Sequence, residues 1–107
     1  SCAGAANSGT AAYIALGYVA GNVDTVDKFA FSDDSRTTLG TGLSAARKRM
    51  GAAAESGTAA YFAGGIESGL VATVNKFAFS DDSRTTLGTG LSAARNYLAG
   101  AANSGTL

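Results

Sequence analysis

Two identical acidic stretches are the first candidates for chemistry in this sequence. Asp33-Asp34-Ser35 and Asp81-Asp82-Ser83 each place two neighbouring carboxylates in a short polar segment. Such a pair could hold a weakly bound calcium ion or act as an acid pair, but the alternating ligands and distal glutamate of an EF-hand loop are missing. Aspartate also bonds to its own backbone in turns. We expect both stretches to form Asx-type hairpin turns, and we predict no metal site.

The remaining composition offers little for catalysis. The chain has no histidine and a single cysteine, Cys2, so Ser-His-Asp and Cys-His arrangements are excluded and no internal disulfide can form. Lys+Arg and Asp+Glu both number 8, which leaves no electrostatic footprint for nucleic acid. No apolar run approaches the roughly 18 residues of a membrane span. We predict no catalytic residue, no cofactor, and neither nucleic acid nor membrane as a partner.

A strict internal repeat organises the chain. Tyr13 recurs as Tyr61, and the stretch Lys28–Arg47 recurs without change as Lys76–Arg95, always with an offset of 48 residues. Periods of about 40–50 residues are typical of propeller blades and solenoid turns. We therefore describe residues 1–107 as a single repeat domain that consists of unit 1 (2–49), unit 2 (50–97) and a partial third unit (98–107).

Each unit predicts four short antiparallel strands. In unit 2 the candidate strands are 51–54, 58–63, 71–79 and 85–91, and Gly, Ser and Asp turn signals separate them. Their centres carry almost no charge on either face, which is typical of sheets covered on both sides. We expect the glycines of the last strand to let a neighbouring sheet approach closely.

One stretch competes as a helix. Leu43–Glu55 is rich in Ala, Arg, Lys and Met, which favour helix. The equivalent stretch, Leu91–Asn103, has Gly100 in its interior and an asparagine at its end. Because both copies of a repeat should share one structure, we predict no helix here and an all-β chain.

The positions that differ between the units predict a recognition surface. Because 34 of 48 paired positions are identical, the remaining 14 stand out, and many of them lie in 14–24 against 62–72, around one loop. Loops carry binding function on rigid scaffolds, although exposed loops also drift neutrally. Arg47 and Arg95, which end the identical stretches, could bind an anion or tie units together through a salt bridge or carbonyl contact. The candidate binding residues are Tyr18, Asn22, Arg47, Ile66, Glu67 and Arg95.

These features together resemble the kelch repeat, a β-propeller blade, in a form typical of bacterial or phage proteins. The resemblance covers nearly the whole chain. Tyr61–Gly65 matches the strand that ends in a double glycine, Phe77 and Phe79 stand where the family has a tyrosine, and Leu91–Arg95 matches the closing segment that ends in arginine. Unit 1 has Leu16-Gly17 at the double glycine, and both units have Thr or Leu in place of the family's tryptophan.

The resemblance implies a fold of two tandem four-stranded blades that is completed by self-association. Propellers need roughly 4–8 blades, so two units would leave apolar faces uncovered, and uncovered faces of that size indicate association. Three chains would then close one ring, or chains would stack head to tail. Residues 2–10 and 98–106 are versions of one segment, so in a closed ring one copy would be displaced or would pair elsewhere.

Kelch propellers are mostly interaction scaffolds, and the resemblance implies the same here. We expect a non-enzymatic blade pair that binds itself, as a ring or head to tail, and presents loops to a protein or glycan ligand. The alternative is a structural subunit of an extracellular filament or phage fibre, which would place the chain outside the cell or on a virion. The third hypothesis is an enzyme. The copper-radical oxidases of this family use histidine ligands, however, and this sequence has no histidine.

Overall fold

Two separate antiparallel sheets make up the fold, which is all-β as predicted. The computed structural model describes residues 3–7, 10–15, 21–55 and 57–95. Within these residues there is no helix, and each sheet has four strands in sequential order, so each is a simple meander. Sheet 1 comprises β1 (Ala3–Asn7), β2 (Ala11–Ala15), β3 (Val26–Ala30) and β4 (Arg36–Thr38). Sheet 2 comprises β5 (Gly51–Glu55), β6 (Ala59–Ala63), β7 (Val74–Ala78) and β8 (Arg84–Thr86).

The two sheets repeat the same register. Tyr13 on β2 lies opposite Lys28 on β3, and Tyr61 on β6 lies opposite Lys76 on β7. The stretch with helical composition is irregular up to Met50 and then forms β5. The repeat therefore decides the local structure, as the comparison of the two copies predicted.

The fourth strand is shorter than predicted and begins earlier. The sequence predicted a strand over 85–91, but β8 covers only Arg84–Thr86, where Arg84 lies opposite Phe77. Beyond it the chain makes spaced backbone bonds to its own unit, among them those from Leu87 N to Val74 O at 3.0 Å and from Leu91 N to Ala72 O at 2.8 Å. Alternating Gly and Thr between these two leucines do not sustain a continuous ladder.

The glycines of this segment have a different role from the one expected. A Cβ at Gly90 would collide with the backbone carbonyl of Ala72, and a Cβ at Gly42 would collide with the carbonyl of Asp24. In both cases the close approach is to the glycine's own unit, whereas the sequence predicted approach by a neighbouring sheet. These glycines fold the end of each unit back on itself.

Opposite faces of the two sheets pack together. Alternate residues of a strand point to opposite faces, and we call the side that carries the strand tyrosine the tyrosine face. In sheet 1 this face is turned to sheet 2 and its members on β2 are fully buried, with Tyr13 at 0 % exposure. The tyrosine face consists of Ala11, Tyr13, Ala15, Val26, Lys28 and Ala30 in sheet 1, and of Ala59, Tyr61, Ala63, Val74, Lys76 and Ala78 in sheet 2.

The other side of each sheet we call the phenylalanine face. In sheet 2 it supplies the buried half of the core, and the rings of Phe62 and Phe77 meet edge to face with centroids 5.8 Å apart. It consists of Ala12, Ile14, Asp27 and Phe29 in sheet 1, and of Ala60, Phe62, Asn75 and Phe77 in sheet 2. The core thus lies between the tyrosine face of sheet 1 and the phenylalanine face of sheet 2.

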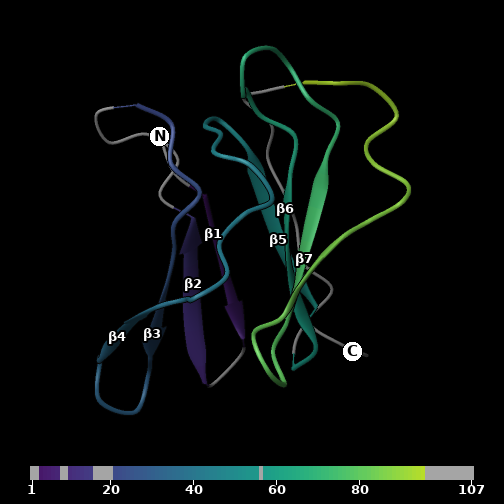
Figure 1. The fold of residues 1–107 in the computed structure, drawn as a ribbon. Coiled ribbons are helices and arrows are strands. Elements are labelled where there is room, and N and C mark those ends of the chain that lie inside the picture. Colours follow the sequence, from purple (N-terminus) through teal and green to yellow (C-terminus); the bar gives the residue numbers. More distant parts are fainter. Residues whose placement is uncertain (1–2, 8–9, 16–20, 56, 96–107) are drawn as a thin grey trace.

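The sheets fan out from their first strands. β1 contacts β5 and β6 of the other sheet, and β4 lies far from sheet 2 (Figure 1). The three residues of β4 and of β8 are all exposed. This arrangement places the inner strands together and the outer strands at the periphery.

Candidate functional site

A hydrogen bond and an ion pair to one aspartate join the two units. The Tyr13 hydroxyl donates to Asp82 Oδ1 at 2.6 Å, and Lys28 Nζ lies 3.1 Å from Asp82 Oδ2. The Tyr13 ring stacks on Phe79 with centroids 5.0 Å apart, and Lys28 Nζ lies 5.4 Å from the centre of the same tyrosine ring. One aspartate of unit 2 is therefore bound by a tyrosine and a lysine of unit 1.

This contact shifts the acid–base properties of its donors. Burial raises the pKa of Tyr13, and the hydrogen bond to Asp82 raises it further. Burial acts to lower the pKa of Lys28, but the hydrogen bonds and charges of Asp82 and Tyr13 outweigh it and raise that pKa. Both donors therefore stay protonated to higher pH than they would in water, and the neutral phenol and the ammonium are the forms that bind the carboxylate.

The turn between β7 and β8 presents Asp82. Ser83 N donates to Asp81 Oδ1 at 3.0 Å, the Asx turn that the sequence predicted, and the Ser83 side chain and amide lower the pKa of Asp81. Asp82 follows in the left-handed region at φ 59°, which aspartate tolerates better than most residues. The first aspartate of the pair thus builds the turn, and the second is aimed at the neighbouring unit.

A second polar cluster lies beside the first. Asn75 is fully buried; its Oδ1 accepts from Ser44 N at 3.1 Å, and its Nδ2 donates to Ser44 Oγ at 3.0 Å and to Thr86 Oγ1 at 2.9 Å. Arg84 Nη1 donates to the Gly42 carbonyl at 2.9 Å. Both contacts hold sheet 2 against the segment that follows β4 of sheet 1.

Arg47 makes a carbonyl contact between the units. Its side chain is 0 % exposed, and Nη2 donates to the Phe62 carbonyl at 3.2 Å. Within the described residues its Nε and Nη1 have no hydrogen-bond partner. Burial lowers the pKa of Arg47, and the charge of Glu67 opposes that effect. Of the two roles considered for this arginine, the geometry matches the carbonyl contact that ties units.

The predicted binding residues gather at one end of the two sheets. Asn22 Nδ2 donates to the Ile66 carbonyl at 3.1 Å and to the Glu67 carbonyl at 3.3 Å. The backbone of Ile66 pairs with that of Lys48, and Gly65 N donates to the Arg95 carbonyl at 2.8 Å. The structure therefore brings Asn22, Arg47, Ile66, Glu67 and Arg95 around one loop, while Tyr18 lies outside the described residues.

Arg95 differs sharply from its equivalent Arg47. Its side chain is exposed, and its Nε lies 3.4 Å from the Ala93 carbonyl, a contact within its own turn. The same residue type is thus buried between the two units in one copy and exposed in the other.

Sequence reasoning considered Asp82 as part of an acidic turn and Phe79 as a strand residue, but it did not predict that they contact Tyr13 and Lys28 of the other unit. Tyr13, Lys28, Phe79 and Asp82 are identical in both copies, whereas the search for a recognition surface concentrated on positions that differ. Their strict repetition was the signal that could have found them, because a contact made between successive units requires both of its halves in each unit.

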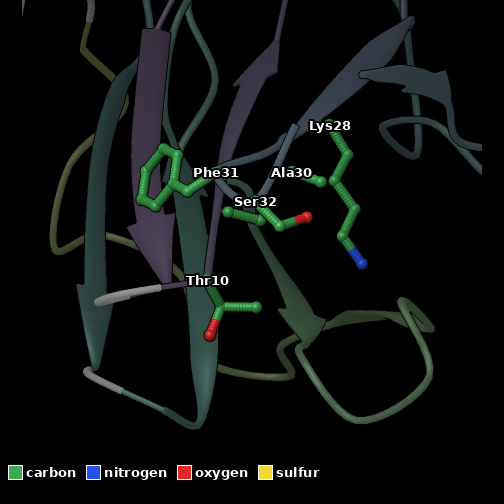
Figure 2. Close-up of a pocket in the computed structure, with 6 residues that line it drawn as sticks. Thr10, Lys28, Ala30, Phe31 and Ser32 are labelled. Atoms are coloured by element: carbon green, nitrogen blue, oxygen red, sulfur yellow. The ribbon is translucent and has the colours of Figure 1, made fainter. Parts of the chain in front are cut away.

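An open recess lies where β2 begins and β3 ends in sheet 1. It has a volume of about 390 Å³ and is lined by Thr10, Ala11, Lys28, Ala30, Phe31 and Ser32. Phe31 and Lys28 extend to opposite sides of the chain that carries them (Figure 2). Because the lysine already binds Asp82, the recess offers hydroxyls and apolar surface rather than an unpaired charge.

Two further findings concern the part of the chain that the structure describes. No helix there is long and apolar enough to cross a membrane. No three side chains of the metal-binding types are grouped within it.

No protein-family model matches the chain, and no curated protein matches it significantly.

Proposed function

We propose that this chain is a non-enzymatic repeat scaffold, a kelch-like blade pair that binds further copies of itself and presents loops for binding. One observation carries the proposal: the two units pack through opposite faces. An interface made from two different surfaces leaves one of each unused at the ends of a stack. On the tyrosine face of sheet 2, Ala59 and Val74 are buried and Tyr61 and Lys76 are half-buried; we propose that this face and the phenylalanine face of sheet 1 receive another copy.

Exposure supports the proposal. Phe31 is 48 % exposed, although its equivalent Phe79 packs against the core. On the outer tyrosine face, Tyr61 and Lys76 are only half-buried, whereas Tyr13 is fully buried. Phe31 is bare although its equivalent is covered. Covering such apolar surface with a further copy would lower the free energy of the system.

Closure into a propeller is the form of assembly that we favour. β1 contacts β5 and β6, and β4 lies away from sheet 2 (Figure 1), which supports a proposal in which the first strands surround a propeller axis. Propellers close at roughly 4–8 blades. Three chains of two blades satisfy this condition.

The loop cluster at one end is the part we propose for ligand binding. Asn22 fixes the Ile66-Glu67 segment of the other unit through two hydrogen bonds, so the loop is held from both units. A protein or a glycan would meet a surface whose side chains differ from unit to unit.

The native mass at two protein concentrations tests the proposal. We expect a species several times heavier than the 10.5 kDa chain at micromolar concentration, and lighter species on dilution. Electron microscopy then separates closed rings from the head-to-tail filament of the alternative reading. A compact 10.5 kDa monomer at every concentration would refute self-assembly.

A further inference from the structure

We infer that Tyr61 and Lys76 of one chain bind Asp34 of a second copy, while Phe31 of that copy stacks on the Tyr61 ring. The inference rests on the proposed function, since it specifies which residues recognise the second copy. It reproduces between chains the contact that Tyr13 and Lys28 make with unit 2 inside the chain.

The donor half is already formed on the outer tyrosine face. Lys76 Nζ lies 5.7 Å from the centre of the Tyr61 ring, close to the 5.4 Å between Lys28 and Tyr13 in the occupied copy. A preorganised pair loses less conformational entropy on binding than two independent side chains.

The acceptor half is also formed before binding. Ser35 N donates to Asp33 Oδ1 at 3.0 Å, and Asp34 has φ 60°, against 59° for Asp82. Asp34 N donates to the Ala30 carbonyl at 2.8 Å, which is also the distance between Asp82 N and the Ala78 carbonyl. The free turn therefore has the backbone conformation of the bound one.

Two further contacts follow from the same equivalence. Arg84 of unit 2 donates to the Gly42 carbonyl of unit 1 inside the chain, so Arg36 of the second copy is the donor toward the Gly90 carbonyl of the first chain. Arg47 donates to the Phe62 carbonyl, so Arg95 of the first chain, which is exposed, is the donor toward the Ile14 carbonyl of the second copy. A second copy thus offers a partner of the right kind to Tyr61, Lys76 and Arg95 of the first chain.

Charge reversal tests the pairing. Lys76→Glu brings two carboxylates together at the contact, and Asp34→Lys brings two ammonium groups together, so each is expected to weaken association at least about tenfold. The chain with both changes restores opposite charges at every contact and is expected to recover most of the lost association. Asp24→Lys is the matched control: Asp24 is exposed and its equivalent is Ala72, so the same change of charge there should leave association unchanged.

Sedimentation of the full chain separates the outcomes. If the native chain is monomeric at all concentrations, the proposed function fails and this inference fails with it. If the native chain assembles and both single variants assemble equally well, self-assembly stands but this pairing is wrong. Should a charge variant fail to fold by circular dichroism, Tyr61→Phe gives the decision, because it keeps the ring and removes only the hydroxyl; an unchanged affinity in that variant contradicts the hydrogen bond to Asp34.

Discussion

Identical residues at equivalent positions of the two units have different environments, because unit 2 packs against unit 1. Arg47 is buried against a carbonyl while Arg95 is exposed. Tyr13 is fully buried against Phe79, while Tyr61 is half-buried on an outer face. Because local sequence is the same in each pair, packing between units determines what these side chains do.

The hydroxyl of Tyr13 provides the first prediction at this scale. Tyr13→Phe removes the hydrogen bond to Asp82, and loss of a bond to a charged acceptor should lower the free energy of unfolding by about 1–3 kcal/mol. The loss should be the same at all protein concentrations, since the contact lies within one chain. Urea denaturation at two concentrations measures it.

Tyr61→Phe is the matched variant in the other unit. The Asp82 turn contacts Tyr13 and Lys28 of unit 1, so we assign the Tyr61 hydroxyl to the contact with a second copy. Any destabilisation should therefore grow with protein concentration, through lost association. An equal, concentration-independent loss in both variants would contradict the assignment of Tyr13 to the internal contact.

Alkaline pH should weaken the contact between the units. The pKa of Tyr13 is raised above its ordinary 10.0 and that of Lys28 above its ordinary 10.5. Groups whose pKa is raised by folding stabilise the fold fully below the unfolded value and lose that contribution as pH rises through the folded one. We expect a constant urea midpoint between about pH 8 and pH 10 from these two groups and a fall above it. In Tyr13→Phe the fall should be shallower, and an equally steep fall would show that other groups cause it.

At the scale of elements, local sequence patterns predict the first three strands of the meander but not the length of the fourth. Alternating apolar residues and the Asp-Asp-Ser turns predicted β5 to β7 to within a few residues. The run after Thr86 also alternates, but Gly90 packs against the carbonyl of Ala72, and the chain leaves the ladder. Alternating residue types indicate which side chains share a face of the sheet. They do not indicate how closely the backbone approaches the neighbouring segment.

A glycine substitution tests this account of the unit's end. In Gly42→Ala the new Cβ collides with the carbonyl of Asp24, so the backbone must shift and the bond from Leu43 N to that carbonyl, 2.8 Å long, is strained. We expect a loss of about 1–3 kcal/mol in the free energy of unfolding. Thermal or urea denaturation measures it against Gly40→Ala.

Gly40 is the control because a Cβ there meets nothing within 4 Å. Alanine at such a site restricts the unfolded chain and should be neutral or stabilising by up to about 1 kcal/mol. Equal losses at the two positions would mean that glycine flexibility, and not the close approach, is what the segment needs.

At the scale of the whole molecule, the repeat predicted two layers but not which faces meet. Strand centres without charge on either side indicated that each face could be covered, and the structure covers one face of each sheet. Which face is chosen depends on the turn that places Asp82 over Tyr13, a contact between residues 69 positions apart that no local pattern contains. The candidate loop could be predicted from the differences between units, whereas the contact between the units could not, because it lies in what they share.

One difference between the units predicts that contacts between chains are weaker than the contact within the chain. Asn75 is buried between the sheets and both donates to and accepts from Ser44. In unit 1 the equivalent residue is Asp27, whose Oδ1 accepts from Thr38 Oγ1 at 2.6 Å. If the outer faces meet as proposed, a carboxylate would be buried where the internal interface has a neutral amide, and burial of a charge costs more.

Asp27→Asn should therefore strengthen self-association. The amide restores a donor toward Ser92, the equivalent of Ser44, and removes the charge, so we expect the dissociation constant from sedimentation to fall about tenfold, which corresponds to about 1.4 kcal/mol. Asp24→Asn removes the same charge from an exposed position and should change little. If both variants associate as the native chain does, position 27 lies outside the interface. If both strengthen association equally, the gain comes from net charge, and the faces that meet between chains are not those that meet within one.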